Sequence, residues 1–329
     1  MHDLQELPPG DALSDTIMTL GIRDVRCSRF EASGDWSFSF PPQERLKFVA
    51  TLRGHAWLLV PRCEPLMIEE GDVFLMGPTP YVVAARPELA PATGAPLYQH
   101  SSVARVGSEV PATTVGVGGS VAFASSGAEF LYEALPIFFV IRRGEPAAKA
   151  IVRTLELLEA EMDSARAGSR LIATRLAEVL LLAGIRSGVI ERGGAPRGWI
   201  GALSDRRIAA ALALLHAQMA RNWTLDDLST AVGMSRSAFA LQFKQRVGRA
   251  PLDYLRYWRM MKARSSLASG RVSIAALAEG LGYNSQAAFT QAFRRQFGCT
   301  PTAYRPPGRK AHAADQPREH PPLSAPVPP

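Results

Sequence analysis

The stretch that decides the fold is Gly282-Tyr283-Asn284-Ser285, followed by a phenylalanine at every fourth residue and closed by Gly298-Cys299-Thr300-Pro301-Thr302-Ala303-Tyr304-Arg305. The phenylalanines are Phe289, Phe293 and Phe297. Their spacing is typical of one face of a helix and not of a strand, in which buried residues alternate with exposed ones. A less well preserved copy of the same pattern lies upstream, so the pattern is an internal repeat.

The upstream copy begins at Thr224 and matches the downstream copy from Ser273, with an offset of 49 residues up to Gly233 and Gly282. One inserted residue then raises the offset to 50. The later matches pair Ser235 with Ser285, Phe239 with Phe289, Phe243 with Phe293, Val247 with Phe297, Gly248 with Gly298, Pro251 with Pro301 and Tyr254 with Tyr304. So many agreements with one slip indicate two related units in tandem.

Each copy predicts a helix, a tight turn and a second helix. In the first copy, Thr224 and Asp227 have the spacing of a capping box, in which a hydroxyl and a carboxylate accept backbone N–H groups at a helix start. Gly233 can take the left-handed conformation that ends a helix, and Ser235 is placed to cap the next one. Between the copies, Pro251 and the apolar residues after it predict a long joining helix that ends at Gly270.

Positive charge is concentrated in the segment that carries the repeat. Residues 199–305 contain 15 Lys and Arg against 5 Asp and Glu, a net charge of +10. The whole chain carries +7, so the remainder carries −3. Helix-turn-helix patterns also occur in all-α proteins that never touch nucleic acid, but a positive field confined to this segment is typical of a surface that neutralises phosphates. The sequence therefore predicts a DNA-binding domain.

The second unit resembles the signature of the AraC/XylS family of bacterial transcription regulators. The matching residues are Gly282-Tyr283, Ser285, Phe289, Phe293, Phe297-Gly298, Thr300-Pro301 and Tyr304-Arg305. The resemblance covers residues 203–305 and implies two helix-turn-helix units whose second helices enter successive major-groove segments on one face of double-stranded DNA, about one helical turn apart. By family precedent we expect an activator that contacts RNA polymerase and is associated with the bacterial nucleoid.

With the phenylalanines turned inward, helical geometry gives the residues that face the groove. In the first reading helix they are Arg236, Ser237, Ala240, Leu241 and Lys244, and in the second they are Gln286, Ala287, Thr290, Gln291 and Arg294. Arginine often occupies the places of Leu241 and Gln291 in the family, so the commonest guanine-reading side chain is missing at both. We expect Ala240 and Leu241 to contact thymine methyls, and Gln286 and Gln291 to prefer adenine. The alternative is that Leu241 packs on a neighbour and base reading is weak.

Residues 15–140 have a different residue pattern, with short β-rich runs separated by Gly and Pro. The runs are 36–40, 46–52, 56–60, 66–68, 73–76, 81–84 and 113–117. Short strands with turn signals between them predict a sandwich or a barrel. Residues 48–81 resemble the cupin-type sensor domain of many regulators in this family. The expected fold class is therefore α+β with two domains, a cupin-like β-barrel with following helices and an all-α domain of two helix-turn-helix units joined by a long helix.

A metal site is not expected in the cupin-like domain. A metal cupin needs two histidines separated by one residue, a nearby carboxylate and a later histidine, because three or four N or O donors must converge on one ion. Here Trp57 stands two residues after His55, Tyr81 stands where the later histidine would fall, and His100 is isolated. We therefore expect no cofactor and no enzyme activity. The alternatives are a metal-dependent cupin enzyme fused to a DNA-binding domain, and a DNA-repair alkyl-transfer protein, whose Pro-Cys-His-Arg type of motif the sequence lacks.

Three cysteines, Cys27, Cys63 and Cys299, suit a reducing cytoplasm and not a disulfide framework. Arg62 stands beside Cys63, where its charge would favour the thiolate. Cys27 and Cys63 are therefore candidate redox sensors, with ordinary packed or surface thiols as the alternative. The expected effector of the N-terminal domain is an unknown small molecule or an oxidant.

The remaining segments complete the expected domain organisation. The N-terminal domain is expected at 13–190, with the barrel at 15–140 and two amphipathic helices at 146–188 that either form a homodimer interface or cover the barrel. Residues 191–202 are expected to be the linker, and residues 1–12 and the proline-dense 306–329 are expected to be disordered. The sequence has no run of eighteen apolar residues and no signal peptide, so we expect a cytoplasmic protein without a membrane partner.

Overall fold

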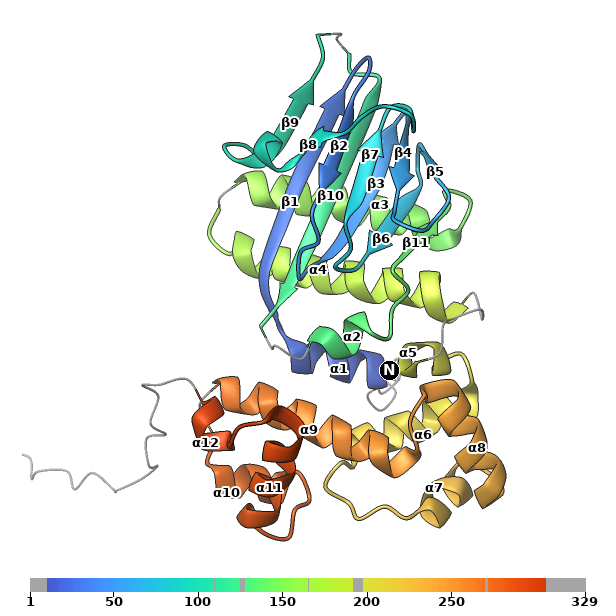
Figure 1. Ribbon diagram of the computed structural model, residues 1–329, viewed down its shortest axis with the longest axis vertical. Coiled ribbons are helices and arrows are strands. Elements are labelled where there is room, and N and C mark those ends of the chain that lie inside the picture. The colour runs from blue at the N-terminus through green and yellow to red at the C-terminus, as the bar shows by residue number, and fades with distance from the viewer. Residues whose placement is uncertain are drawn as a thin grey trace, which may run out of the picture.

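The computed structural model describes residues 11–108, 111–124, 128–164, 166–191, 198–269 and 272–305. A β-rich N-terminal domain lies next to an all-helical C-terminal domain (Figure 1). The expected α+β fold with two domains is confirmed. The N-terminal domain opens with helix α1 (Ala12–Leu20), which lies at the junction between the two domains (Figure 1).

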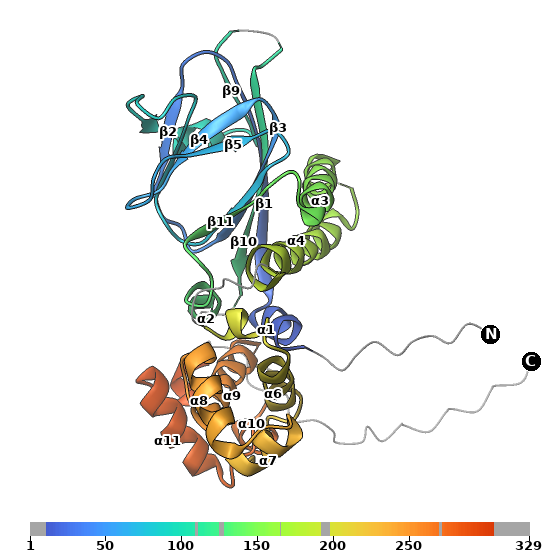
Figure 2. The same cartoon turned by 90° about the vertical axis from the view of Figure 1, so that its right-hand side faces the viewer.

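The strands of the N-terminal domain form two sheets that face each other (Figure 2). The six-stranded sheet has the order β11-β6-β3-β10-β1-β9, with bounds β1 (Ile22–Ala32), β3 (Leu46–Arg53), β6 (Val73–Met76), β9 (Val103–Val106), β10 (Thr114–Phe123) and β11 (Phe138–Ile141). The five-stranded sheet has the order β5-β4-β7-β2-β8, with bounds β2 (Ser37–Phe40), β4 (His55–Leu59), β5 (Leu66–Glu69), β7 (Tyr81–Ala84) and β8 (Ala92–Thr93).

The described strands do not close into the barrel that the sequence suggested. The strands at the sheet edges are β9, β11, β5 and β8, none longer than four residues. Such short strands offer few N–H and C=O groups with which to continue the hydrogen bonding around a barrel. The domain is held instead by the long antiparallel pair β1–β10, which runs from Ile22 opposite Phe123 to Ala32 opposite Thr114, and by apolar packing between the sheets.

Helices α3 (Pro146–Ser164) and α4 (Ser169–Ile185) cover the outer face of the six-stranded sheet, close to the expected ranges (Figure 2). Ile151, Leu155 and Leu158 of α3 are buried against this face. A glycine in β10 eases the close approach, because a Cβ at Gly119 would lie 3.2 Å from a methyl group of Leu158 and the leucine would have to shift slightly. A short helix α2 (Glu129–Tyr132), a 3-10 helix η1 (Ala95–Tyr98) and a π-helix η3 (Arg186–Glu191) complete the domain.

The C-terminal domain consists of helices in the order that the repeat predicts. The first unit is α7 (Leu225–Ala231) and α8 (Arg236–Val247), and the second is α10 (Ile274–Gly280) and α11 (Gln286–Phe297). The long helix α9 (Pro251–Ser269) joins them. Helices α5 (Trp199–Ala202) and α6 (Arg206–Ala217) precede the first unit, and α12 (Pro301–Tyr304) follows the second.

Two of the segments expected to lack structure contain ordered residues. Helix α5 lies inside the segment 191–202, because the Trp199 ring stacks on Phe130 at 5.1 Å and is buried. Asp11 caps α1 and Ala12 is buried, although both fall in the segment 1–12. The rest of the expected linker, 192–197, and the expected disorder at 1–10 and 306–329 lie outside the described residues.

The hydrophobic core is divided in an unexpected place. One continuous cluster runs from Phe48 in the six-stranded sheet through Leu13 of α1 and Trp199 of α5 to Phe243 of α8. The second helix-turn-helix unit has a cluster of its own around Phe289 and Phe293. The first unit is therefore packed into the same core as the N-terminal domain, whereas the second unit is not.

Candidate DNA-reading surface and sites of the N-terminal domain

The helix starts of both units carry the caps that the sequence predicts. The Thr224 backbone N–H donates to Asp227 Oδ2 at 2.9 Å, and the Asp227 N–H donates to Thr224 Oγ1 at 3.1 Å. The bond from the Thr224 hydroxyl holds the pKa of Asp227 below its usual value. Ser235 Oγ accepts from the Ala238 N–H at 3.4 Å, and Ser285 Oγ from the Ala288 N–H at 3.1 Å. Each reading helix therefore begins at the predicted residue.

The turns between the helices depend on glycine to different degrees. Gly233 and Gly282 have φ values of 64° and 77°, in the left-handed region that side chains disfavour. A Cβ at Gly233 would meet nothing within 4 Å, but a Cβ at Gly282 would lie 2.3 Å from the carbonyl oxygen of Ala220. Only the second turn is therefore packed against the segment that follows α6.

The phenylalanines of both units point inward, which turns the opposite helix faces to solvent. Phe239, Phe243, Phe289 and Phe293 are all fully buried. The exposed positions are Arg236, Ser237, Leu241 and Lys244 on α8, and Gln286, Ala287, Gln291 and Arg294 on α11, while Ala240 and Thr290 are half-buried. The two helices lie on the same side of the domain (Figure 2). The structure thus gathers all ten predicted residues on two equivalent faces, and their contact with DNA stays a prediction.

Leu241 does not pack on a neighbouring residue. Its side chain is 60% exposed, among the most exposed large apolar side chains of the described chain. An isolated exposed leucine is ordinary on a protein surface, but this one lies in the middle of the reading face. The alternative in which Leu241 is a packing residue is therefore wrong for this structure.

The positive charges on the reading faces differ in how far they are neutralised. Arg236 Nη1 lies 3.5 Å from Asp226 Oδ2, in a pair whose two side chains are both more than half exposed. Such a pair contributes little to stability but offsets part of the arginine charge. Lys244 and Arg294, in the last turns of α8 and α11, have no carboxylate partner among the residues that the structure describes. These two are the free cations of the reading faces.

Arg259 is a buried cation that sequence reasoning did not single out. Its Nε donates to the Met219 carbonyl at 2.7 Å and its Nη2 to the Arg221 carbonyl at 3.0 Å. It thereby fixes α9 to the segment between α6 and the first unit, and burial lowers its pKa. An arginine directly after Trp258, on the buried face of a predicted helix, is the sequence signal that could have found it.

Helix α1 joins the N-terminal domain to α6 and α9. Lys262 Nζ of α9 donates to Thr19 Oγ1 at 2.9 Å, and Ser265 Oγ of α9 donates to the Thr19 carbonyl at 2.5 Å. On the other side of the junction, Trp199 Nε1 donates to the Phe130 carbonyl at 3.3 Å. Because β1 begins two residues after α1 ends, the junction is directly continuous with the six-stranded sheet.

His216 is buried beside this junction in its neutral form. Its Nε2 lies 2.8 Å from the Tyr254 hydroxyl, and its ring stacks on Trp258 at 4.0 Å. Burial, assisted by the charge of Lys262, lowers the pKa of His216 to about 3. The 3.7 Å approach of its Nδ1 to Asp15 Oδ2 is therefore not an ion pair at neutral pH.

The two candidate redox cysteines do not form a reactive pair. Cys27 lies in β1, where burial, with a smaller contribution from Glu159, raises the pKa of its thiol to about 12. A thiol with this pKa is almost entirely protonated at neutral pH and is a poor nucleophile. Cys63 is exposed in the turn after β4, and both are free thiols. The geometry gives no support to Cys27 as a redox sensor.

The two histidines of the N-terminal domain considered as metal ligands lie on its surface. His55 opens β4 and is exposed, and His100 is exposed as well. Within the described ranges, no group of three or more His, Cys, Asp or Glu side chains is arranged to hold a metal ion.

In the part of the chain that the structure describes, no helix combines the length and the apolar character needed to cross a membrane.

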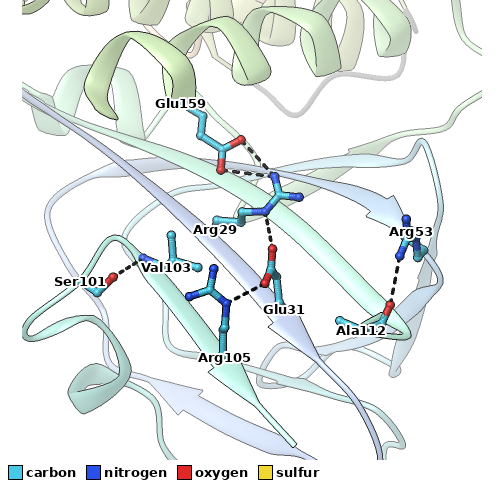
Figure 3. A network of polar contacts seen from close by, with 8 residues as sticks. All are labelled: Arg29, Glu31, Arg53, Ser101, Val103, Arg105, Ala112 and Glu159. Atoms are coloured by element: carbon cyan, nitrogen blue, oxygen red, sulfur yellow. Dashed lines mark hydrogen bonds and ion pairs between the residues drawn. The ribbon is translucent and has the colours of Figure 1, made fainter. Parts of the chain in front are cut away.

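The described residues of the N-terminal domain enclose two hollows of interest. The first lies between the sheets, measures about 110 Å³ and is lined mainly by apolar and aromatic side chains such as Trp36, Phe40 and Tyr81. The second measures about 420 Å³ and is lined by residues of β1, β3, β9 and β10, including Arg29 and Arg105. Figure 3 shows the polar contacts around the second hollow. Neither hollow could be predicted from the sequence, because their residues come from segments far apart along the chain.

Both domains match known families. Residues 11–189 match the family model described as Cupin, and residues 228–306 match the one described as Helix-turn-helix domain. A putative AraC-like transcription regulator from Streptomyces antibioticus is 33% identical over 90% of this chain and 98% of its own length, and one from Streptomyces lividans is 32% identical over the same shares. Among solved structures, the DNA-binding domain of AdpA in complex with a target DNA is 30% identical, covers 30% of this chain and 88% of that chain, and has a TM-score of 0.28.

The match to the Streptomyces proteins extends over both domains, so it concerns the whole arrangement and not the repeat alone. The cupin match covers the two sheets with α3 and α4, and the helix-turn-helix match covers both reading helices. The chain therefore belongs to the AraC family of transcription regulators, with a helix-turn-helix DNA-binding domain behind a cupin domain.

Proposed function

We propose that this regulator reads two adjacent major-groove segments with α8 and α11. The observation that carries the proposal is the equivalence of the two exposed faces, each set opposite a pair of fully buried phenylalanines. Helix α9 has 19 residues, which at 1.5 Å per residue gives a length of about 28 Å. This length is close to the roughly 34 Å between major-groove segments one helical turn apart.

The side chains on these faces favour A·T pairs. On α8, Leu241 and Ala240 offer apolar surface that suits the methyl group of thymine. On α11, Gln286 and Gln291 can each donate to and accept from adenine. Arg236 is the one arginine on the two faces near a helix start, and its contact with Asp226 reduces its availability to guanine.

Selection of binding sites from random DNA tests this assignment. We expect A·T-rich half-sites separated by about 10 base pairs, one helical turn. Leu241→Arg, which restores a long donor in the first helix, should add a guanine preference to the first half-site alone, and Gln291→Ala should relax one base pair of the second. G-rich half-sites under both helices with the wild-type protein would contradict the assignment.

We further propose that the N-terminal domain regulates this DNA binding across α1. Support comes from Thr19, which is bonded to two side chains of α9, the helix that sets the separation of the reading helices. A small-molecule effector is favoured over an oxidant, because the Cys27 thiol is buried with a raised pKa. The role is regulatory and not catalytic, in line with the full-length relatives, which are named as transcription regulators.

Activation through RNA polymerase, on chromosomal DNA in a bacterial cytoplasm, is the expected outcome of binding. Run-off transcription with purified polymerase tests it, since an increase in transcript means activation and a decrease means repression. Homodimerisation is proposed through the outer faces of α3 and α4. These faces expose Leu157, Leu171, Ile172 and Val179, and contiguous exposed apolar residues mark interaction surfaces.

A further inference from the structure

We propose that the larger hollow of the N-terminal domain binds a small organic dianion, a molecule with an apolar body that carries either a phosphate group or two carboxylates. The proposal names the class of effector and therefore rests on the proposed regulatory function. It is carried by the shape of the hollow, by the charges that line it, and by the way those charges are held.

The hollow has the size and the mixed lining of a small-molecule site. Its volume of about 420 Å³ lies in the range of roughly 300 to 1,000 Å³ that is usual for ligand pockets. Three guanidinium groups come from three strands, Arg29 of β1, Arg53 of β3 and Arg105 of β9, and Glu31 is the one carboxylate among the lining residues that the structure describes. These described lining residues carry a net charge of +2, and Glu159 of α3, which pairs with Arg29, lowers the charge of the whole group to +1. Apolar surface is supplied by Leu52, Val106, Pro111 and Val115.

Two of the arginines, Arg29 and Arg105, are hydrogen-bonded to carboxylates. Glu31 accepts from Arg29 Nε at 2.8 Å through one oxygen and from Arg105 Nε at 3.0 Å through the other (Figure 3). Arg29 Nη1 also donates to Glu159 of α3 at 3.1 Å. The bonds from Arg29 and then Arg105 hold the pKa of Glu31 below its usual value, so it remains a carboxylate.

This arrangement occupies the Nε atoms and leaves terminal nitrogens of the guanidinium groups for a ligand. No described residue accepts from Arg29 Nη2 or from the two terminal nitrogens of Arg105. Guanidinium groups bind carboxylate and phosphate through parallel hydrogen bonds. Arg29, which bonds to two carboxylates, is the better ordered of the two, so an anion bound to it would lose less affinity to the ordering of the side chain.

Arg53 extends the site toward β3. Its only recorded bond within the described ranges is a long one of 3.5 Å from Nη1 to the Ala112 carbonyl (Figure 3). A guanidinium with one weak partner keeps most of its donors for water or for a ligand. An anion with acceptors at two ends can therefore reach Arg53 as well as the group formed by Arg29 and Arg105.

The other hollow does not suit such a ligand. At about 110 Å³ it is smaller than the roughly 150 Å³ apolar cavity that is known to hold benzene. Among the residues that the structure describes, its lining contains no arginine, lysine or carboxylate. The larger hollow is also connected to the junction between the two domains. Arg29 of β1 pairs with Glu159 of α3, and β1 directly follows α1, the helix at that junction.

Isothermal titration calorimetry of the full chain without DNA tests the site with four probes. Phenyl phosphate and phthalate carry a dianion on a ring, benzyl alcohol is a neutral analogue, and sulfate supplies charge without an apolar body. We expect at least one of the two ring dianions to bind with a Kd of about 1 mM or tighter, and benzyl alcohol and sulfate to bind at least about tenfold more weakly. Binding of phenyl phosphate alone identifies a phosphate ligand, binding of phthalate alone a dicarboxylate, and binding of both their shared charge.

Variants locate the binding in the hollow. Arg53→Gln and Arg105→Gln should each weaken binding of the preferred probe by about tenfold or more. Arg86→Gln is the matched control, because Arg86 pairs with Asp35 outside the hollow, and it should bind as the wild type does. Circular dichroism and DNA binding without probe show that each variant is folded.

Three results would overturn the proposal: no binding of either ring dianion, equal binding of benzyl alcohol or sulfate, or unchanged binding by Arg53→Gln and Arg105→Gln. None of these results would bear on the proposed DNA reading, which is tested separately by the selection experiment. If the selected half-sites were not A·T-rich while the probes still bound, the assignment of the DNA-reading residues would be refuted and the anion site would stand.

Discussion

Lys244 and Arg294 offer a direct test of whether both reading helices contact DNA. They occupy equivalent positions 50 residues apart, in the last turns of α8 and α11. Neither has a carboxylate partner among the described residues, so each brings a full positive charge to its face. We therefore expect each to meet one phosphate, and we consider Lys244→Ala, Arg294→Ala and the double substitution.

The size of the effect follows from counterion release. Each phosphate contact adds about −0.9 to the slope of log K against log salt concentration. Each single substitution should make the slope shallower by about 0.9, and the double by about 1.8. Between 50 and 200 mM salt, one lost contact corresponds to a change of roughly 3.5-fold in relative affinity. Arg236→Ala should change the slope less, because Asp226 already offsets part of its charge.

Fluorescence anisotropy with a labelled duplex at several NaCl concentrations measures these slopes. Gln291→Ala is the control on the same helix, and it should keep the wild-type slope while discriminating less at one base pair. Lys149→Ala, at an exposed position on α3, controls for net charge. A slope change in only one of the two single variants would mean that one helix alone touches DNA. Equal, salt-independent behaviour of Arg294→Ala and Gln291→Ala would refute the docking altogether.

Three further expectations concern stability and assembly. Gly282→Ala should lower the free energy of unfolding by about 2–4 kcal/mol, because its Cβ would meet the Ala220 carbonyl, whereas Gly233→Ala should cost about 1 kcal/mol; equal losses in urea unfolding would contradict the packing at Gly282. His216 has a folded pKa of about 3 and an unfolded value near 6.5, so the unfolded chain binds the extra proton between these values and stability falls as pH drops below about 6.5. The loss at pH 5 is roughly 2 kcal/mol and should disappear in His216→Phe; an identical decline of the melting temperature in both proteins would argue against it. Leu171→Glu should shift the sedimentation coefficient from dimer to monomer while Ile137→Glu, equally exposed but off these helices, should not; a wild-type monomer would remove the proposed interface.

The two helix-turn-helix units and the helix that joins them could be predicted from the sequence because their determinants are local. Caps, turn glycines and the inward phenylalanines recur within short distances of one another, and the repeat shows them twice. The exposure of the reading positions follows from helical geometry once the phenylalanines are placed inside. The 60% exposure of Leu241 could not be predicted in this way, because it depends on whether any other segment covers the helix.

The N-terminal domain is harder to predict from the sequence, because the residues that determine its fold are far apart along the chain. Strand β1 has no recognisable strand pattern, because Arg23, Arg26 and Arg29 interrupt the alternation that marks a strand, and these charges are explained only by solvent and by carboxylate partners. Helix α5 falls inside the predicted linker, because it is ordered by the burial of Trp199 against Phe130, a residue 69 positions away.

The larger hollow illustrates the same limit for a candidate site. Arg29, Arg53 and Arg105 stand in no recognisable spacing along the chain. Only the pairing of β1 with β9 and with β10, and of β10 with β3, brings them to one place. Sequence patterns detect residues that share an element, whereas this group is defined by the order of strands in a sheet.

The division of the hydrophobic core predicts how the molecule moves. Tyr254, Trp258 and Met261 of α9 belong to the cluster of the sandwich and the first unit, whereas Met260 and Leu267 belong to that of the second unit. Only partly buried residues, Met219 and Phe297, touch both clusters. Cooperative opening follows shared packing, so amide hydrogens of α8 should exchange together with those of the sandwich, and those of α11 as a separate unit. The boundary between the two packing units therefore falls at Met260 and Met261 of α9, between the two reading helices and not between the two domains.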